Sequence, residues 1–231
     1  MPQTLTIAIC VSDEVTLPDF IAPVEILTGL NDADHPVFGA SMGEVSHRVT
    51  IDYLAPTMDP VVSSKGRNAP CFIPTLTYAD ALASGKQYDI IWVPAGPIPD
   101  FTTGESRIPP EEIAFIAQQA PNAQYVMSVC AGSYQLTLAG VLAGKRATTN
   151  KAFYRALAAI TPKDIQWVPQ ARWVVDGNVW TSSGVTAGAD MALAFVEHLA
   201  GAKVARVIRG LLEIPEVTDQ DDPFAAFHGL V

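Results

Sequence analysis

The sequence predicts one α/β domain, a three-layer α/β/α sandwich with a mainly parallel, flavodoxin-like sheet and a cysteine nucleophile elbow. Several apolar runs are continuous and do not alternate with polar residues, which is typical of strands buried on both faces of a parallel sheet. Helix-like stretches lie between these runs, as in successive βαβ units. We find no internal repeat, low-complexity tract or linker, so residues 1–231 are predicted to form a single domain.

The first half of the chain supplies three strands and two helices. Pro18 and Asp19 introduce the first helix, and Pro109 and Pro110 introduce the second, because proline is tolerated at the start of a helix. Residues 31–47 are rich in Gly, Asp and Asn and are expected to form a loop, and residues 61–73 a short hairpin-like excursion. The expected strands are 5–11, 49–55 and 88–94, and the expected helices are 20–29 and 111–119.

The second half begins with an apolar strand at 125–129, followed by a helix over 134–142. Asp176-Gly177-Asn178 is a hairpin signal between two β-rich runs. Thr148-Thr149 is interpreted as a strand end. The remaining expected elements are strands at 165–168, 172–175 and 179–181 and helices at 187–199 and 204–212.

Composition narrows the possible functions. Hydrophobic residues make up 49% of the chain and charged residues only 16%, which is typical of a folded globular protein. The net charge of −10 disfavours nucleic acid and anionic membranes as partners. No signal peptide or transmembrane run is visible, so we expect a cytoplasmic protein. The three cysteines, Cys10, Cys71 and Cys130, form neither a disulfide framework nor a zinc motif, and no metal is expected.

Cys130 is the strongest candidate for a catalytic residue. It follows a buried strand and precedes a helix, so its thiol is expected at the positive end of the helix dipole, which favours the thiolate. The alternative is a small apolar residue that closes the strand. Two other strands lead to Asp19 and to Gly96, and the ends of neighbouring parallel strands converge. Asp19 could exchange a proton with the thiol, and the backbone N–H groups of Gly96 and Ala131 could bind a developing anion.

Each of these residues also has a structural interpretation. Asp19 could only cap a helix, Gly96 could only serve a turn, and Ser182–Gly188 could be a loop followed by a cap. Glu25 is interpreted as a solvated or ion-paired helix residue. Cys10 and Cys71 are interpreted as packing residues, and the sequence does not place any of the four histidines beside Cys130.

Five segments, in order along residues 5–213, resemble the motifs of the ThiJ/PfpI superfamily, which has a class I glutamine amidotransferase-like fold. Ser128–Ser133 resembles the cysteine elbow of that superfamily, and Pro94–Pro97 resembles its PGG loop. The other similar segments are Asp19–Glu25, Leu138–Thr149 and Gly184–Asp190. Among its branches, the pattern is most similar to isocyanide hydratases. It is also similar to the amidase-like domains of certain transcription regulators, but the short acidic tail and the negative net charge lead us to expect no DNA-binding domain like the C-terminal one of those regulators.

The resemblance implies a cofactor-free hydratase or lyase, usually a homodimer, that converts a small uncharged isocyanide to an N-substituted formamide. It implies that Cys130 is the nucleophile and Asp19 the proton shuttle, with substrate or oxyanion contacts from Gly96, Ala131, Asn150 and Gly184. Asn150 stands where many relatives have His, and Ala131 where hydratases often have Thr. Two alternatives stay open: a glyoxalase-type conversion of 2-oxoaldehydes, which Asn150 disfavours, and a redox sensor in which Cys130 is oxidised. The sequence leaves the roles of Glu25 and of the acidic tail, 216–222, undetermined.

Overall fold

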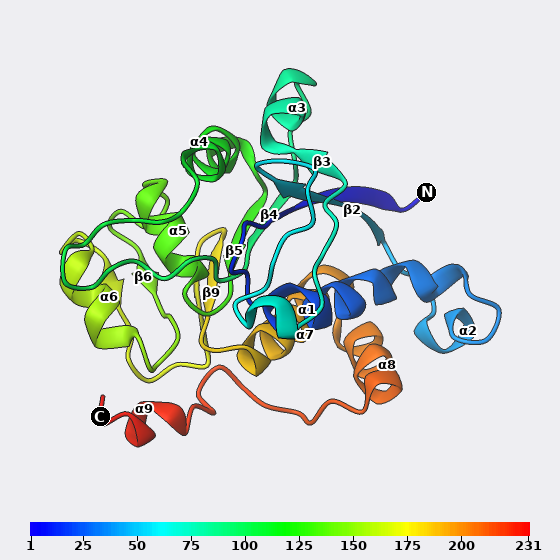
Figure 1. Ribbon diagram of the computed structural model, residues 1–231. Coiled ribbons are helices and arrows are strands. Elements are labelled where there is room, and N and C mark those ends of the chain that lie inside the picture. Colours follow the sequence, from blue (N-terminus) through cyan, green and yellow to red (C-terminus); the bar gives the residue numbers. More distant parts are fainter.

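The computed structural model describes the backbone of residues 1–231 and every side chain except that of Arg67 (Figure 1). Over this chain, seven strands form one sheet in the order β3-β2-β1-β4-β5-β9-β8, and only β8 is antiparallel to its neighbour. A separate two-stranded parallel sheet pairs β6 with β7. The strands are β1 Gln3–Cys10, β2 His47–Ala55, β3 Leu76–Thr77, β4 Ile90–Val93, β5 Tyr125–Ser128, β6 Arg146–Ala147, β7 Gln166–Trp167, β8 Trp173–Asp176 and β9 Val179–Ser182.

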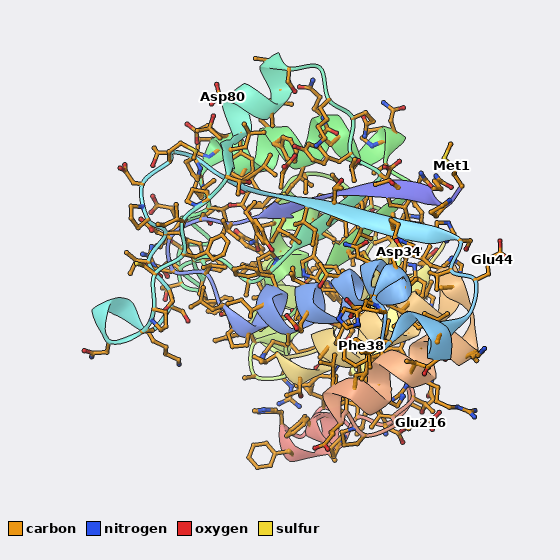
Figure 2. The ribbon with its side chains drawn as sticks, turned by 90° about the vertical axis from the view of Figure 1, so that its right-hand side faces the viewer. Met1, Asp34, Phe38, Glu44, Asp80 and Glu216 are labelled. Atoms are coloured by element: carbon orange, nitrogen blue, oxygen red, sulfur yellow. The ribbon has the colours of Figure 1, made fainter. Side chains whose placement is uncertain are left out.

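Helices cover both faces of the main sheet. Figure 1 shows α1, α7 and α8 on one face and α3, α4 and α5 on the other. Figure 2, turned by 90°, places Asp80 of α3 and Glu216 of the C-terminal segment on opposite sides of the sheet. The α-helices are α1 Pro18–Thr28, α2 Gly39–Met42, α3 Tyr78–Ala83, α4 Pro110–Gln119, α5 Gly132–Leu138, α6 Tyr154–Ile160, α7 Thr186–Ala200, α8 Ala202–Leu212 and α9 Phe224–Phe227. The 3₁₀ turns are η1 Gly29–Asp34, η2 Gly66–Asn68 and η3 Ala120–Asn122.

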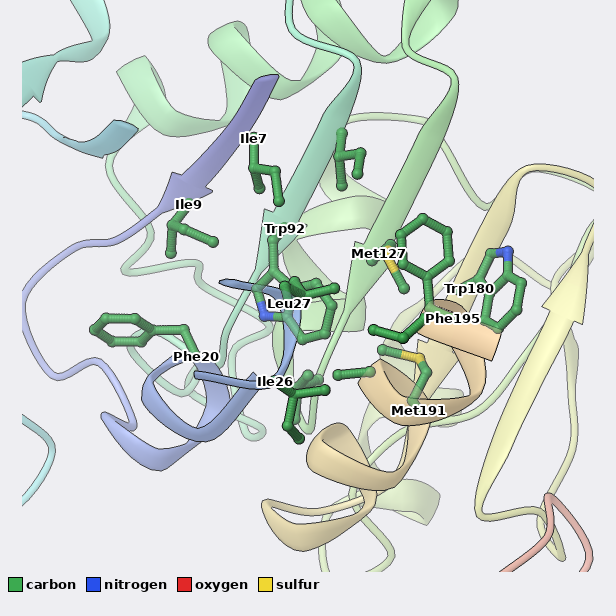
Figure 3. Close-up of a cluster of buried hydrophobic side chains, with 14 of the residues drawn as sticks. Ile7, Ile9, Phe20, Ile26, Leu27, Trp92, Met127, Trp180, Met191 and Phe195 are labelled. Atoms are coloured by element: carbon green, nitrogen blue, oxygen red, sulfur yellow. The ribbon is translucent and has the colours of Figure 1, made fainter. Parts of the chain in front are cut away.

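The alternating directions of side chains along each strand divide the core into two layers. On one side, Ile7 and Ile9 of β1 and Trp92 of β4 pack toward α1 and α7 (Figure 3). On the other side, Ala8 and Cys10 of β1 pack toward α3 and α4. Both layers are buried, which explains why the strands have continuous apolar sequences instead of alternating ones.

The strand order fixes where the site can form. Apart from the two-residue β3, the parallel strands β2-β1-β4-β5-β9 follow the flavodoxin order, in which the chain reverses direction across the sheet between β1 and β4. The carboxyl ends of β1, β4 and β5 therefore lie side by side at the place where ligands bind in such sheets. Residues that follow these three strands are brought together by topology alone.

The α/β architecture and the mainly parallel sheet are confirmed, and the differences from prediction are local. Asp176 and Val179 flank the predicted hairpin turn between β8 and β9. The expected loop over 31–47 contains the end of η1 and the short α2. The excursion over 61–73 is joined by an antiparallel bridge between Val61 and Phe72, as expected. The helix after Cys130 begins earlier than predicted, at Gly132, and ends at Leu138.

Candidate functional site

Cys130 lies in the sharp connection between β5 and α5. Its φ of +59° is in the left-handed region, which a non-glycine residue adopts only when its surroundings hold it there. The Cys130 N–H donates to the carbonyl of Ser183 at 2.9 Å. Gly132 begins α5 because a Cβ there would lie 2.1 Å from the carbonyl oxygen of Val93. The turn is therefore fixed by one backbone hydrogen bond and by the close approach of two chain segments.

A cavity of about 490 Å³ opens beside Cys130. Its walls come from the segment between β1 and α1, the excursion at 63–70, and the segments that follow β6 and β9. The lining is largely apolar or hydroxyl-bearing, and Lys65 is the charged residue among the lining residues described. The lining consists of Thr16, Leu17, Pro18, Ser63, Ser64, Lys65, Ala69, Pro70, Cys130, Asn150, Phe153 and Val185.

Asp19 is the acidic residue of this site. Its side chain is fully buried in the first turn of α1 but makes no cap hydrogen bond there, so the helix-cap interpretation is wrong. Instead, Oδ2 accepts a hydrogen bond from the Ala95 N–H at 3.1 Å, while Oδ1 has no hydrogen-bond partner among the described residues. Burial raises the pKa of Asp19 to about 7, and the bond from Ala95 lowers it less. A carboxyl group with this pKa exchanges protons readily near neutral pH.

Pro23 leaves the backbone carbonyl of Asp19 free to bond outside the helix. Proline has no N–H, so the carbonyl of Asp19, four residues earlier, lacks its usual partner within the helix. The indole Nε1 of Trp92 on β4 donates to that carbonyl at 3.1 Å instead. Both the backbone and the side chain of Asp19 are thus bonded to the end of β4, which explains the Asp19-to-Pro23 spacing of the motif.

The thiol of Cys130 is only 6% exposed, and the structure corrects the expectation of a pre-formed thiolate. Burial, followed by the negative charge of Asp19, raises the pKa of the Cys130 thiol to about 12. Hydrogen bonds from the Ala131 N–H, the Asn150 amide and the Val185 N–H act in the opposite direction. Burial therefore outweighs the start of the short helix α5, and the resting thiol keeps its proton.

Gly96 follows β4 as predicted, but it is not among the residues that line the cavity beside Cys130. A Cβ at Gly96 would meet the Gln135 amide nitrogen and the Ser12 hydroxyl oxygen, each at 3.1 Å. Gln135 also donates to the carbonyl of Pro94 at 2.9 Å. The glycine admits these polar side chains beneath the loop, and a contact from its N–H to a developing anion stays a prediction.

Asn150 bonds to the thiol of Cys130 and packs against Gly184. The Asn150 Oδ1 accepts from the Ala152 N–H at 2.9 Å, which leaves the amide nitrogen for the thiol. A Cβ on Gly184 would lie 2.8 Å from that amide nitrogen. Gly184 therefore provides the space that Asn150 occupies.

Three residues that contact Cys130 were not assigned to the site from the sequence. The Thr149 hydroxyl donates to the Cys130 carbonyl at 3.0 Å, so Thr149 does more than end a strand. Ser183 accepts from the Cys130 N–H, and the Val185 N–H points to the thiol, so Ser182–Gly188 is more than a loop and cap. The motif resemblance was the available signal for Thr149 and Val185, whereas Ser183 lies one residue before the nearest similar segment.

The other singled-out residues lie outside this site. Cys10 is buried in the opposite core layer, and Cys71 is exposed, which corrects its interpretation as a packing residue. Glu25 is exposed on α1. Among the residues that the structure describes, no three His, Cys, Asp or Glu side chains gather as a metal site. Within the same residues, no helix has the length and apolar character needed to span a bilayer.

Comparison with known proteins identifies the family. The DJ-1/PfpI family model matches residues 5–198. The chain belongs to the DJ-1/PfpI family. It is 34% identical to the isonitrile hydratase of Pseudomonas putida over 214 aligned residues. The aligned region covers 91% of this chain and 79% of that protein.

Solved structures agree with this assignment. A DJ-1/PfpI-type (THiJ/PfpI) protein from Pseudomonas syringae superposes with a TM-score of 0.71 at 27% identity, covering 96% of this chain and 78% of that one. Drosophila melanogaster DJ-1beta superposes with a TM-score of 0.69 at 20% identity, covering 94% and 100% of the two chains. At that identity, the second comparison supports the DJ-1/PfpI fold alone.

Proposed function

We propose that this protein is a cysteine-dependent hydratase that converts an isocyanide to an N-substituted formamide, with Cys130 at a nucleophile elbow. The observation that carries this proposal is the juxtaposition of Cys130, held at φ +59° beside an open cavity, with the buried carboxyl of Asp19. The 34% identity to an isonitrile hydratase supports the choice of reaction.

In the first step, the Cys130 sulfur attacks the terminal carbon of the isocyanide. The S–H bond breaks and the S–C bond forms, while the carboxylate of Asp19 takes the thiol proton and passes it to the same carbon. The product of this step is a thioimidate, R–N=CH–S–Cys. Because the resting thiol is protonated, thiolate forms only as the proton moves to Asp19, which keeps a single negative charge in the buried site.

In the second step, water adds to the thioimidate carbon as Asp19 accepts a proton from it. Asp19 passes this proton to the nitrogen. The hydroxyl of the resulting tetrahedral adduct then gives its proton to Asp19 as the C=O bond forms and the C–S bond breaks, and the sulfur recovers that proton from Asp19. The formamide R–NH–CHO leaves, so that isocyanide and water are the only reactants consumed. The Ala131 N–H, the Asn150 amide and the Val185 N–H stabilise negative charge at the sulfur during both steps.

The cavity supports a small uncharged substrate. Leu17, Pro18, Ala69, Pro70, Phe153 and Val185 supply an apolar surface for the organic substituent. The only charged residue among the described lining side chains is exposed Lys65, so a phosphate or sugar would find few fixed partners.

The proposal is tested by incubating the protein with alkyl and aryl isocyanides and, separately, with methylglyoxal. Formamide production that is lost in Cys130→Ala supports the hydratase. Lactate without formamide would replace it with the glyoxalase-type reaction. Turnover of neither substrate, with ready conversion of Cys130 to its sulfinate by peroxide, would favour redox sensing. Asn150, which stands where many relatives have His, disfavours the glyoxalase-type reaction, and the raised pKa of the Cys130 thiol disfavours redox sensing.

A further inference from the structure

The C-terminal segment 213–231 leaves the end of α8 and runs past the start of α7 to α9 (Figure 1). The acidic residues at 216–222 suggest a solvated tail, but one of them is not solvated. The Asp222 side chain is 1% exposed and forms an ion pair with Lys151, whose side chain is 2% exposed, at 3.3 Å. A buried ion pair at the end of a chain restrains both segments, because removing one partner leaves an uncompensated charge in the interior.

Two hydrogen bonds hold the Lys151 ammonium beside Asp222. Nζ donates to the Thr148 hydroxyl at 2.7 Å and to the Ala171 carbonyl at 2.8 Å, and Oδ2 of Asp222 lies 3.3 Å from Nζ as an ion-pair partner. The other carboxylate oxygen of Asp222 accepts from the Phe224 N–H at 3.0 Å. The ring of Tyr154 lies 6.0 Å from Nζ. The pair thus joins the tail to the segment 148–151 with defined geometry.

The same short segment holds two of the contacts to Cys130. Thr149 donates to the Cys130 carbonyl, and the Asn150 amide bonds to its sulfur. Lys151 follows these residues directly, so its position sets theirs.

A second connection runs through the backbone. The Arg172 N–H donates to the Asp219 carbonyl in the tail at 2.7 Å, and the Ser183 N–H donates to the Arg172 carbonyl at 2.8 Å. The Ser183 carbonyl in turn accepts from the Cys130 N–H at 2.9 Å. The tail is therefore linked to both sides of the thiol by two separate sets of hydrogen bonds.

We propose that Lys151 and Asp222 are positioning residues, through which the C-terminal tail places Asn150 and Thr149 against Cys130. Neither residue lines the cavity beside Cys130, so neither is assigned to the chemistry. The tail is part of the machinery that makes the thiol competent, and an intact Lys151–Asp222 pair is required for full reactivity of Cys130.

The test measures the rate at which iodoacetamide alkylates Cys130, followed on its own peptide by mass spectrometry. A Cys71→Ser background removes the exposed thiol. In Asp222→Asn, we expect loss of the Asn150 contact to raise the Cys130 pKa by about one pH unit, so the rate at pH 8 falls roughly tenfold. Glu216→Gln makes the same charge change at an exposed position in the same tail, and its rate should stay within about twofold of the parent.

A second variant keeps the test decisive if Asp222→Asn does not fold. The double variant Lys151→Met with Asp222→Leu replaces the ion pair by apolar side chains, which buried sites often accept without loss of stability. It still lacks the hydrogen bonds to Thr148 and Ala171, so slow alkylation is expected. A folded double variant whose Cys130 reacts at the parental rate or faster would overturn the proposal.

This inference rests on the proposed role of Cys130, but its readout does not depend on turnover. If the parent protein hydrates no isocyanide and the variants still slow alkylation, the hydratase assignment fails and the positioning role stands. If isocyanide turnover is present, the variants should lower kcat about tenfold or more with little change in KM, since positioning errors act on the reacting geometry.

Discussion

Two buried carboxyl groups lie on opposite faces of the sheet, and the comparison separates burial from function. Asp19 and Glu112 are both fully buried, and burial raises the pKa of each to about 7. Each also has one oxygen without a hydrogen-bond partner among the described residues. Each carboxyl group also raises the pKa of a neighbouring thiol, Asp19 that of Cys130 and Glu112 that of Cys10. Cys130 lines a cavity, whereas Cys10 and Glu112 are enclosed in the core. A shifted pKa identifies a catalytic group only when a nucleophile and an open space accompany it.

Replacing the nucleophile should have the largest effect. Cys130→Ala is expected to reduce isocyanide hydration by about a thousandfold or more, because the covalent intermediate cannot form. The measurement is formamide production by chromatography at saturating substrate. Cys10→Ala is the matched control in the opposite core layer and should leave kcat nearly unchanged.

The two carboxyl groups should differ sharply in their effects on turnover. Asp19→Asn removes the proton shuttle and should lower kcat/KM by about 10²–10⁴-fold. Glu112→Gln keeps the shape and hydrogen bonds of a neutral carboxylic acid and should retain kcat/KM within about threefold. Equal losses in both variants would show that the comparison between the two sites is wrong.

In the parent, kcat/KM should rise with pH through about 7 as Asp19 ionises to the base that accepts the thiol proton.

Asp19→Asn and Glu112→Gln should change the pH dependence of the free energy of unfolding in the same direction. Both carboxyls have folded pKa values above their unfolded ones, so each contributes stability below about pH 4 that is lost as pH rises through about 7. A shift from 3.8 to about 7 for Asp19, or from 4.5 to about 7 for Glu112, corresponds to about 3–4 kcal/mol each. Urea unfolding from pH 5 to 8 should therefore show a falling free energy of unfolding in the parent. Asp19→Asn and Glu112→Gln should each flatten that slope, and a slope unchanged by either would contradict the assigned burial effect.

Gly184→Ala should have a smaller effect that is confined to the thiol. The new Cβ would displace the Asn150 amide, which lies 2.8 Å from its position. We expect Cys130 alkylation at pH 8 to slow about three- to tenfold, with a small change in melting temperature. Gly140→Ala would be a poor control because Gly140 has a φ of +76°, whereas Gly210→Ala in α8 meets open space and should leave alkylation unchanged.

The parts of the fold that follow from periodicity were predictable. Continuous apolar runs identified β1, β2, β4 and β5, and the turn at Gly177-Asn178 identified the β8–β9 hairpin. The convergence of Asp19 and Cys130 followed from the ends of parallel strands, and the family match confirmed the resemblance.

The features that the sequence did not reveal share a physical cause. Side chains from Ser12 and Gln135, far away in the sequence, approach the open side of Gly96, and its part in an anion site stays a prediction. The thiol was expected to be ionised because a helix follows it, but burial depends on tertiary packing, which local sequence does not encode. The ion pair between Lys151 and Asp222 joins residues separated by most of the C-terminal third of the chain, and no spacing rule connects them.

The proposed mechanism requires a covalent bond between Cys130 and the substrate carbon. The parent protein, quenched with acid during turnover of an isocyanide and analysed by intact-protein and peptide mass spectrometry, should carry a thioimidate whose added mass equals that of the isocyanide and maps to Cys130. Cys130→Ala treated in the same way should show no adduct and no formamide. Formamide production by Cys130→Ala, or an adduct found only on Cys71, would contradict the assignment of Cys130 as the nucleophile.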